Sequence, residues 1–165
     1  METTMTKEQR DKYFKARNKN KEREAKAIEW MEHKKIDHIR YGIDALDTGY
    51  PLWNVPQFVR SAPDFITFTS QAQFLEAKSF YEVIKLKTRD IEEYIIWNRS
   101  MPVYILFYDE KFDTFSCNKF DDIIVSMFKN SCEMDHYDES EDNTYYILER
   151  EWLVEFKKLE KEHEG

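Results

Sequence analysis

The sequence predicts a mixed α/β or α+β fold in which helices flank a central mixed β-sheet. Segments with helical periodicity alternate along the chain with short apolar runs of strand periodicity, and no internal repeat is visible. The chain has 165 residues, of which 41% are hydrophobic, which is enough to bury one core. We therefore expect a single domain over residues 1–165.

A long helix is expected first, from Lys7 to Lys35. This stretch has good helix formers, no Gly or Pro, and an apolar stripe through Ala27, Ile28 and Met31. Its first part, up to Lys26, holds nine Lys or Arg against four Asp or Glu. We therefore expect residues 1–20 to form a basic segment, either as part of the helix or as a flexible arm. Its lysines and arginines either contact phosphates or are simply exposed to solvent. The candidate phosphate contacts are Lys15, Arg17, Lys19 and Lys21.

The sequence pattern in the middle of the chain predicts a β-hairpin. A connecting region from Arg40 to Pro63 ends in a short strand expected over Gln57–Ser61. Two apolar runs follow, Asp64–Thr69 and Gln73–Phe80, and the polar junction between them is typical of a tight connection.

The remaining elements follow from the same patterns. Residues 133–143 are expected to be an acidic loop, because six acids and no Lys or Arg occur between Glu133 and Asp142. The other expected elements are a helix over Thr88–Trp97, strands over Val103–Tyr108 and Phe112–Ser116, a helix over Asp121–Lys129, a strand over Tyr145–Leu148 and an amphipathic helix over Glu151–Glu162.

Of the five acid-x-Lys triplets in the chain, only Glu76-Ala77-Lys78 lies inside an apolar strand. Because side chains alternate along a strand, Glu76 and Lys78 project side by side from one face. A hairpin centred near Ser70 also brings Asp64 opposite Glu76, on that same face. Two carboxylates and an ammonium group then converge. They suit either a hard divalent cation, Mg²⁺ or Mn²⁺, or a buried salt-bridge network.

The string Pro63-Asp64, followed after eleven residues by Glu76-Ala77-Lys78, resembles the signature of the PD-(D/E)XK nucleases. The residues just before it, Phe58 to Ala62, are similar to the strand that enters the catalytic aspartate in archaeal Holliday-junction resolvases. Upstream, the sequence from Lys21 to Ala25 is similar to the start of the first helix of those enzymes. The resemblance covers about residues 21–115 and implies a restriction-endonuclease-like core.

The resemblance also implies roles for individual residues. Asp64, Glu76 and the backbone carbonyl of Ala77 would hold Mg²⁺ or Mn²⁺, and Lys78 would act on the attacking water. A first-helix glutamate would complete the site. Resemblance points to Glu22, whereas helical phase points to Glu24, which stacks with Ile28 on the apolar side.

Three further candidates follow from position or similarity. Lys85 and Lys87, just after the motif strand, are candidate nucleic-acid contacts. Cap-snatching RNA endonucleases place a helical histidine ahead of a similar motif, which makes His38 a candidate as well.

The function expected is therefore a metal-dependent nuclease, most simply a DNA endonuclease, either structure-specific or junction-resolving. The alternatives are an RNA endonuclease and a catalytically silent nuclease-like binding or interaction protein, for example a phage or defence-system factor. By analogy with dimeric enzymes of this fold, a homodimer is one oligomeric state that we consider for this chain. No apolar run is long enough for a membrane span and no signal peptide is visible, so we expect a cytoplasmic protein, with phage origin as one source.

Overall fold

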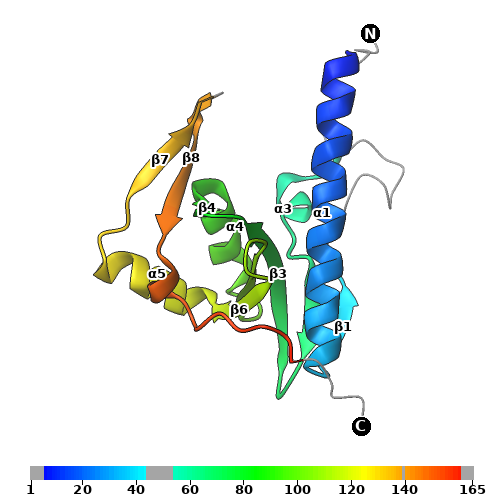
Figure 1. The fold of residues 1–165 in the computed structure, drawn as a ribbon, viewed down its shortest axis with the longest axis vertical. Coiled ribbons are helices and arrows are strands. Elements are labelled where there is room, and N and C mark those ends of the chain that lie inside the picture. Colours follow the sequence, from blue (N-terminus) through cyan, green and yellow to red (C-terminus); the bar gives the residue numbers. More distant parts are fainter. Residues whose placement is uncertain (1–5, 44–53, 139, 161–165) are drawn as a thin grey trace.

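The computed structural model describes residues 6–43, 54–138 and 140–160. Figure 1 shows the elements in space. In chain order they are α1 (Lys7–His33), β1 (Asp37–Arg40), α3 (Gln57–Arg60), β2 (Phe65–Phe68), β3 (Ala72–Phe80), β4 (Ile84–Lys87), α4 (Thr88–Trp97), β5 (Val103–Asp109), β6 (Thr114–Lys119), α5 (Phe120–Lys129), β7 (Met134–Tyr137), β8 (Ser140–Leu148) and the 3₁₀ turn η2 (Arg150–Trp152).

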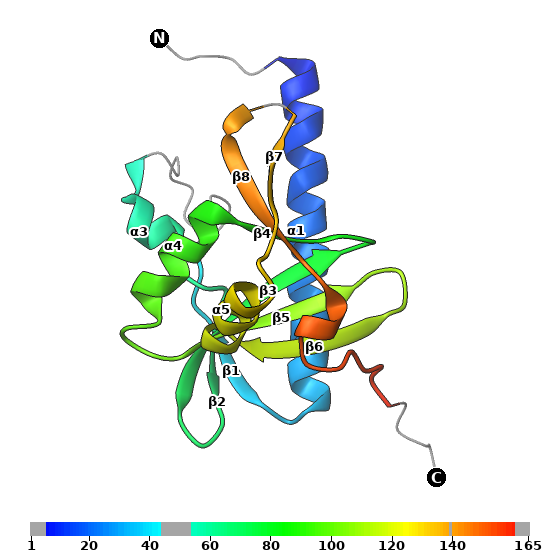
Figure 2. The ribbon, with the colours of Figure 1, turned by 90° about the vertical axis from the view of Figure 1, so that its left-hand side faces the viewer.

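Five strands form a central mixed sheet in the order β1-β2-β3-β5-β6. Strands β3 and β5 run parallel, and the other neighbouring pairs are antiparallel. Helix α1 packs against one face, and α4 and α5 pack against the other (Figure 2). The expected fold class, a central mixed sheet flanked by helices, is confirmed.

Strand β5, in the interior of the sheet, contributes to the core on both faces, because successive side chains point in opposite directions. Ile105 and Phe107 pack with α4 and α5. Leu106 lies in a second cluster with Ala27 and Met31 of α1, and all three are almost completely buried. Strand β3 alternates in the same way, so its even-numbered side chains face α4.

Helix α1 begins with a capping box, in which Thr6 Oγ1 accepts a hydrogen bond from the Gln9 amide and Gln9 Oε1 accepts one from the Thr6 amide. Its N-terminal half extends beyond the sheet (Figure 1). Residues 7–20 are helical, and their use as a phosphate-binding segment stays a prediction. Among the described helices, none is both long and apolar enough to span a bilayer.

Several expected elements are confirmed. The hairpin is formed by β2 and β3, and the helix over Thr88–Trp97 has the expected bounds. Strand β5, strand β6 and helix α5 occur close to their expected positions. Two strands, β1 and β4, were not expected, since four-residue segments with two or three charged or polar side chains carry little strand signal.

The strand expected over Gln57–Ser61 is wrong, because this segment is the helical turn α3. Pro56 begins it, and the Pro56 carbonyl accepts hydrogen bonds from the amides of Val59 and Arg60. Phe58 stacks on Trp97 at a ring-centroid distance of 4.3 Å. Tertiary packing on α4 thus takes the place of strand pairing.

The acidic loop expected over residues 133–143 is instead part of a β-hairpin. Strand β8 lies between β4 and β7 in a separate three-stranded sheet, ordered β4-β8-β7. The charged side chains of Glu133, Asp135 and Asp138 are exposed, so the hairpin forms without burying any of these three charges. Apolar residues of β8, such as Leu148, anchor this hairpin in the core.

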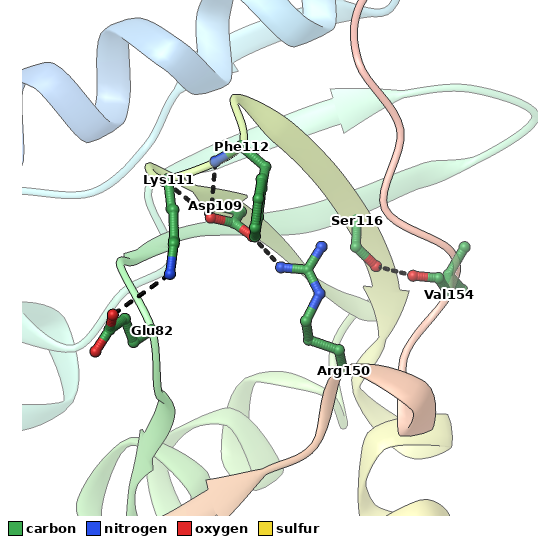
Figure 3. Close-up of polar contacts among 7 residues, drawn as sticks. All are labelled: Glu82, Asp109, Lys111, Phe112, Ser116, Arg150 and Val154. Carbon is green, nitrogen blue, oxygen red and sulfur yellow. Dashed lines mark hydrogen bonds and ion pairs between the residues drawn. The ribbon is translucent and has the colours of Figure 1, made fainter.

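The C-terminal helix expected over Glu151–Glu162 is also wrong in the part that is described, up to residue 160. After η2 the chain runs extended and forms a bridge between Lys157 and Phe115 of β6. Two polar contacts hold it there. Ser116 Oγ donates to the Val154 carbonyl (Figure 3). The Val154 amide donates to Asn118 Oδ1 at 2.7 Å. These side chains satisfy backbone groups that a helix would have paired internally.

Asp109 ties the second sheet to the first. Its carboxylate is 1% exposed, forms an ion pair with Arg150, and accepts hydrogen bonds from the amides of Lys111 and Phe112 (Figure 3). The guanidinium of Arg150 lies 4.2 Å from the ring centroid of Phe156. The turn after β5 and the segment after β8 therefore share one buried anion.

We expect Asp109→Ala to destabilise the protein by about 3 kcal/mol, because it removes the buried carboxylate that pairs with Arg150 and accepts hydrogen bonds from two partly buried backbone amides. The measurement is the free energy of unfolding from urea titration. Glu155→Ala, which removes an exposed ion pair with Lys157, is the control and should leave the midpoint unchanged. Equal losses in the two variants would contradict this role for Asp109.

Candidate active site

The register of the β2–β3 hairpin builds the site. Phe65 pairs with Leu75, so Asp64, the residue before β2, lies across from Glu76. The Asp64 amide donates to Glu76 Oε2 at 3.3 Å, and the Ala77 amide donates to Asp64 Oδ2 at 2.9 Å. The two carboxylates are therefore neighbours, as the hairpin centred near Ser70 predicted.

Lys78 lies beside Glu76 on the face toward α4. Its Nζ is 3.6 Å from Glu76 Oε1 and 2.7 Å from Asp90 Oδ2. All three side chains are about one-sixth exposed or less. Tyr94 donates its hydroxyl to Glu76 Oε1 at 2.9 Å, and the ring of Tyr94 lies 5.6 Å from Lys78 Nζ.

The reasoning from sequence missed Asp90 and Tyr94. Both lie on α4, four residues apart, and therefore on the same side of that helix. This spacing was visible in the sequence, but nothing in it indicated that α4 would pack over β3. The contact depends on the chain path between the two elements.

These groups open into a cavity of about 450 Å³ between α1, α3, β3 and α4. Its walls carry five cationic and five anionic side chains. The cations are Arg23, Arg40, Arg60, Lys78 and Arg89. The anions are Glu24, Asp64, Glu76, Asp90 and Glu93.

The structure separates the two first-helix glutamates. Glu24 lines this cavity, and its Oε2 lies 3.4 Å from Arg40 Nη2. Glu22 lines a different cavity, together with Lys26, Tyr108 and others. Helical phase, which favoured Glu24, therefore agrees with the placement of these residues.

Arg23 was not expected as a site residue. It lines the cavity, and its Nε is buried with no hydrogen-bond partner among the described residues. The positive charge of Arg23 acts on both Asp64 and Glu76. A buried guanidinium donor beside two carboxylates suits an anionic ligand such as a phosphate.

The other predicted residues lie outside the cavity. Lys15, Arg17, Lys19 and Lys21 lie on the N-terminal half of α1, where Lys19 Nζ is 3.9 Å from Glu110. Lys85 and Lys87 are on β4, against tyrosine rings. His38 is on β1, bonded through Nδ1 to the Ile36 carbonyl at 3.0 Å.

Burial raises the pKa of the two central carboxyl groups. Burial, and then the charge of Asp64, raise the pKa of Glu76 to about 7. Burial likewise raises the pKa of Asp64, against the charge of Arg23. Burial would lower the pKa of Lys78, but the carboxylates of Glu76 and Asp90 outweigh it and raise that pKa.

These carboxylates fit a divalent cation. Among the described residues, no group of three or more His, Cys, Asp or Glu side chains is arranged to hold a metal ion. Mg²⁺, however, commonly uses only one or two carboxylates and keeps several waters. Asp64 and Glu76 supply two adjacent carboxylates whose repulsion a cation would relieve.

The raised pKa of Glu76 makes the stability of the metal-free protein depend on pH. The folded state binds a proton at Glu76 up to about pH 7, whereas an unfolded glutamate loses it near 4.5. Stability should therefore fall as the pH rises between these values, by at most about 3 kcal/mol.

We expect Glu76→Gln to remove this dependence, because glutamine cannot ionise. In EDTA, the variant should melt above the wild type at pH 8.5, and the difference should shrink toward pH 5. Thermal unfolding across this range is the measurement, with Glu22→Gln as the control. A constant difference at all pH values would contradict a protonated Glu76.

The similarities to known proteins that we found are similarities of overall structure. No protein-family model matches the chain, and no curated protein matches it. A nuclease from a fusellovirus is similar in structure, with a TM-score of 0.46 and 10% identity over 93% of this chain and 89% of that one. A Holliday junction resolvase from the archaeal hyperthermophile Archaeoglobus fulgidus has a TM-score of 0.43 and 13% identity, over 74% of this chain and 83% of that one.

Proposed function

We propose that the chain is a divalent-metal-dependent nuclease that hydrolyses phosphodiester bonds, with DNA favoured over RNA. The observation that supports this most is the convergence of Asp64, Glu76 and Lys78 on one wall of a charged cavity. A buried salt bridge needs neither the second carboxylate nor the arginines around it. The arginines suit phosphate groups, and the carboxylates suit a cation.

In this proposal Asp64, Glu76 and the Ala77 carbonyl would hold Mg²⁺ or Mn²⁺. When bound, the ion supplies charge that polarises the scissile phosphate and acidifies a water. Tyr94 orients Glu76 through its hydrogen bond to Oε1. Arg23, with its unpaired Nε, contributes a donor for a phosphate oxygen.

Lys78 acts on the attacking water or on the developing charge. The adjacent carboxylates of Glu76 and Asp90 keep its ammonium group protonated, so it donates hydrogen bonds but does not serve as a base. Its ammonium lies 3.6 Å from Glu76 Oε1, beside one of the two carboxylates that would hold the cation. A fixed ammonium at that place stabilises negative charge that develops in the transition state.

We expect Asp64→Asn, Glu76→Gln and Lys78→Ala each to lower cleavage by on the order of 10²-fold or more, while the fold is retained. The measurement is cleavage of labelled single-stranded, duplex, flapped and four-way DNA and single-stranded RNA, each in Mg²⁺, Mn²⁺ or EDTA. Glu32→Gln and Lys34→Ala, in another acid-x-Lys triplet on the surface, are the matched controls.

Retained activity in all three site variants would refute the site. Folded wild-type protein that binds nucleic acid but cuts none of these substrates would favour the alternative of a catalytically silent binding protein.

A second prediction compares the two glutamates of α1. Glu24→Gln should lower activity roughly 10- to 100-fold, because Glu24 lines the cavity and its charge acts on Asp64. Glu22→Gln, two residues away on the same helix, should leave activity unchanged. The rate at several Mg²⁺ concentrations is the measurement. The opposite order of effects would restore Glu22 as the glutamate of the site.

A further inference from the structure

The three-stranded sheet β4-β8-β7 has one face in the core and one face outside. Ile84 and Leu86 of β4 are buried in the core. The alternating residues Lys85 and Lys87 therefore point to the other face. On β8, Tyr145 pairs directly with Lys87, so it belongs to this outer face too.

The outer face carries a tyrosine–lysine cluster, made of Tyr137, Tyr145, Lys85 and Lys87. The two rings lie 4.6 Å apart between centroids. Lys85 Nζ lies 4.4 Å from the centroid of Tyr145 and 5.2 Å from that of Tyr137. Tyr145 is 7% exposed and supports the half-buried Tyr137, whose ring is the more accessible of the two.

This cluster is next to the proposed catalytic cavity. Lys87 is the N-cap of α4, and Arg89 and Asp90 in the first turn of that helix line the cavity. The hydroxyls of Thr88 and Thr144 are 2.6 Å apart and join α4 to β8. Burial raises the pKa of Tyr137, and the charges of Lys85, Asp90 and Lys78 are near enough to act on that pKa.

The charges of this sheet are arranged asymmetrically. Strand β4, which leads into the cavity, carries Lys85 and Lys87. Strand β7, at the opposite edge, carries Asp135, which accepts a hydrogen bond from the Tyr145 hydroxyl at 3.4 Å. A phosphate backbone would be attracted along β4 and repelled from β7, which leaves its bases over the tyrosine rings.

We propose that the tyrosine–lysine cluster binds a single-stranded segment of nucleic acid and directs it into the catalytic cavity. The inference rests on the proposed function and narrows its substrate to nucleic acids with an unpaired segment. An accessible ring between lysines can stack one unpaired base while the lysines contact its phosphates. Bases within a duplex have no free face to offer such a ring.

The test is fluorescence anisotropy in EDTA, where cleavage does not interfere, with oligothymidylate, oligouridylate and a DNA duplex as probes at one fixed salt concentration. We expect the wild type to bind the single strands more tightly than the duplex. Tyr137→Ser should weaken single-strand binding roughly tenfold, and Tyr137→Phe should keep it, because stacking needs the ring and not the hydroxyl.

Two further variants guard against misfolding and general charge effects. Lys85→Glu combined with Lys87→Glu changes side chains at the sheet surface and should also weaken single-strand binding. Tyr81→Ser combined with Lys111→Glu alters another exposed tyrosine–lysine pair, with Nζ 5.9 Å from the ring centroid, and should have no effect. Unfolding midpoints confirm that each variant is folded.

Single-strand binding by folded Tyr137→Ser equal to that of the wild type would overturn the inference, as would a wild-type preference for the duplex. A cleavage assay in Mg²⁺ separates this inference from the proposed function. If the wild type cleaves and Tyr137→Ser cleaves equally fast, the proposed role of the tyrosine–lysine cluster is rejected, while the proposed nuclease function stands. Loss of single-strand binding in Tyr137→Ser, with no cleavage by the wild type, would support the cluster and reject the nuclease. The thymidylate and uridylate arms decide between DNA and RNA.

Discussion

The pairing of Phe65 with Leu75 is the constraint on which the candidate site depends. It places Asp64 across from Glu76 and puts both on the face that α4 covers. A shift of one residue in this register would send Asp64 to the opposite face, where α1 packs. The apolar side chains guard against the shift, because Phe65 and Leu75 belong to the core beneath α1 and would lose that burial. The same packing that stabilises the hairpin thus positions its carboxylates.

The cost of this arrangement is a concentration of charge inside a partly closed cavity. Five cations and five anions line it, so the charges nearly balance, but the balance is uneven in space. Burial and the neighbouring charge of Asp64 raise the pKa of Glu76 to about 7. At the same time the Nε of Arg23 lacks a partner among the described residues. An ion-pair network that only stabilises the fold needs neither two adjacent carboxylates nor an arginine nitrogen without a partner. A cation between the carboxylates and a phosphate at the arginine would satisfy both.

The second sheet is coupled to this centre by polar contacts at its two ends. At one end, buried Asp109 pairs with Arg150 just after β8. At the other, Thr88 and Thr144 join the start of α4 to β8. The acidic hairpin is therefore held beside the site by more than the burial of Leu148 and its neighbours. Strand β4 of the same sheet carries Lys85 and Lys87, so a chain of net charge −8 still presents lysines next to its candidate active site.

Local pattern determined much of this protein: the helices α1 and α4, the β2–β3 hairpin and the shared face of Glu76 and Lys78 all follow from periodicity along short segments. The helical phase of α1 also favoured Glu24, which lines the cavity. Elements whose conformation depends on distant partners were decided only by the tertiary structure. Gln57–Arg60 is helical because Phe58 stacks on Trp97, the chain after Arg150 is extended because β6 satisfies its backbone, and the acidic stretch is a strand because β8 is paired on both sides. The contacts of Asp90, Tyr94 and Arg23 with the site belong to this second group, since no spacing along a chain records which helix will pack across a given strand.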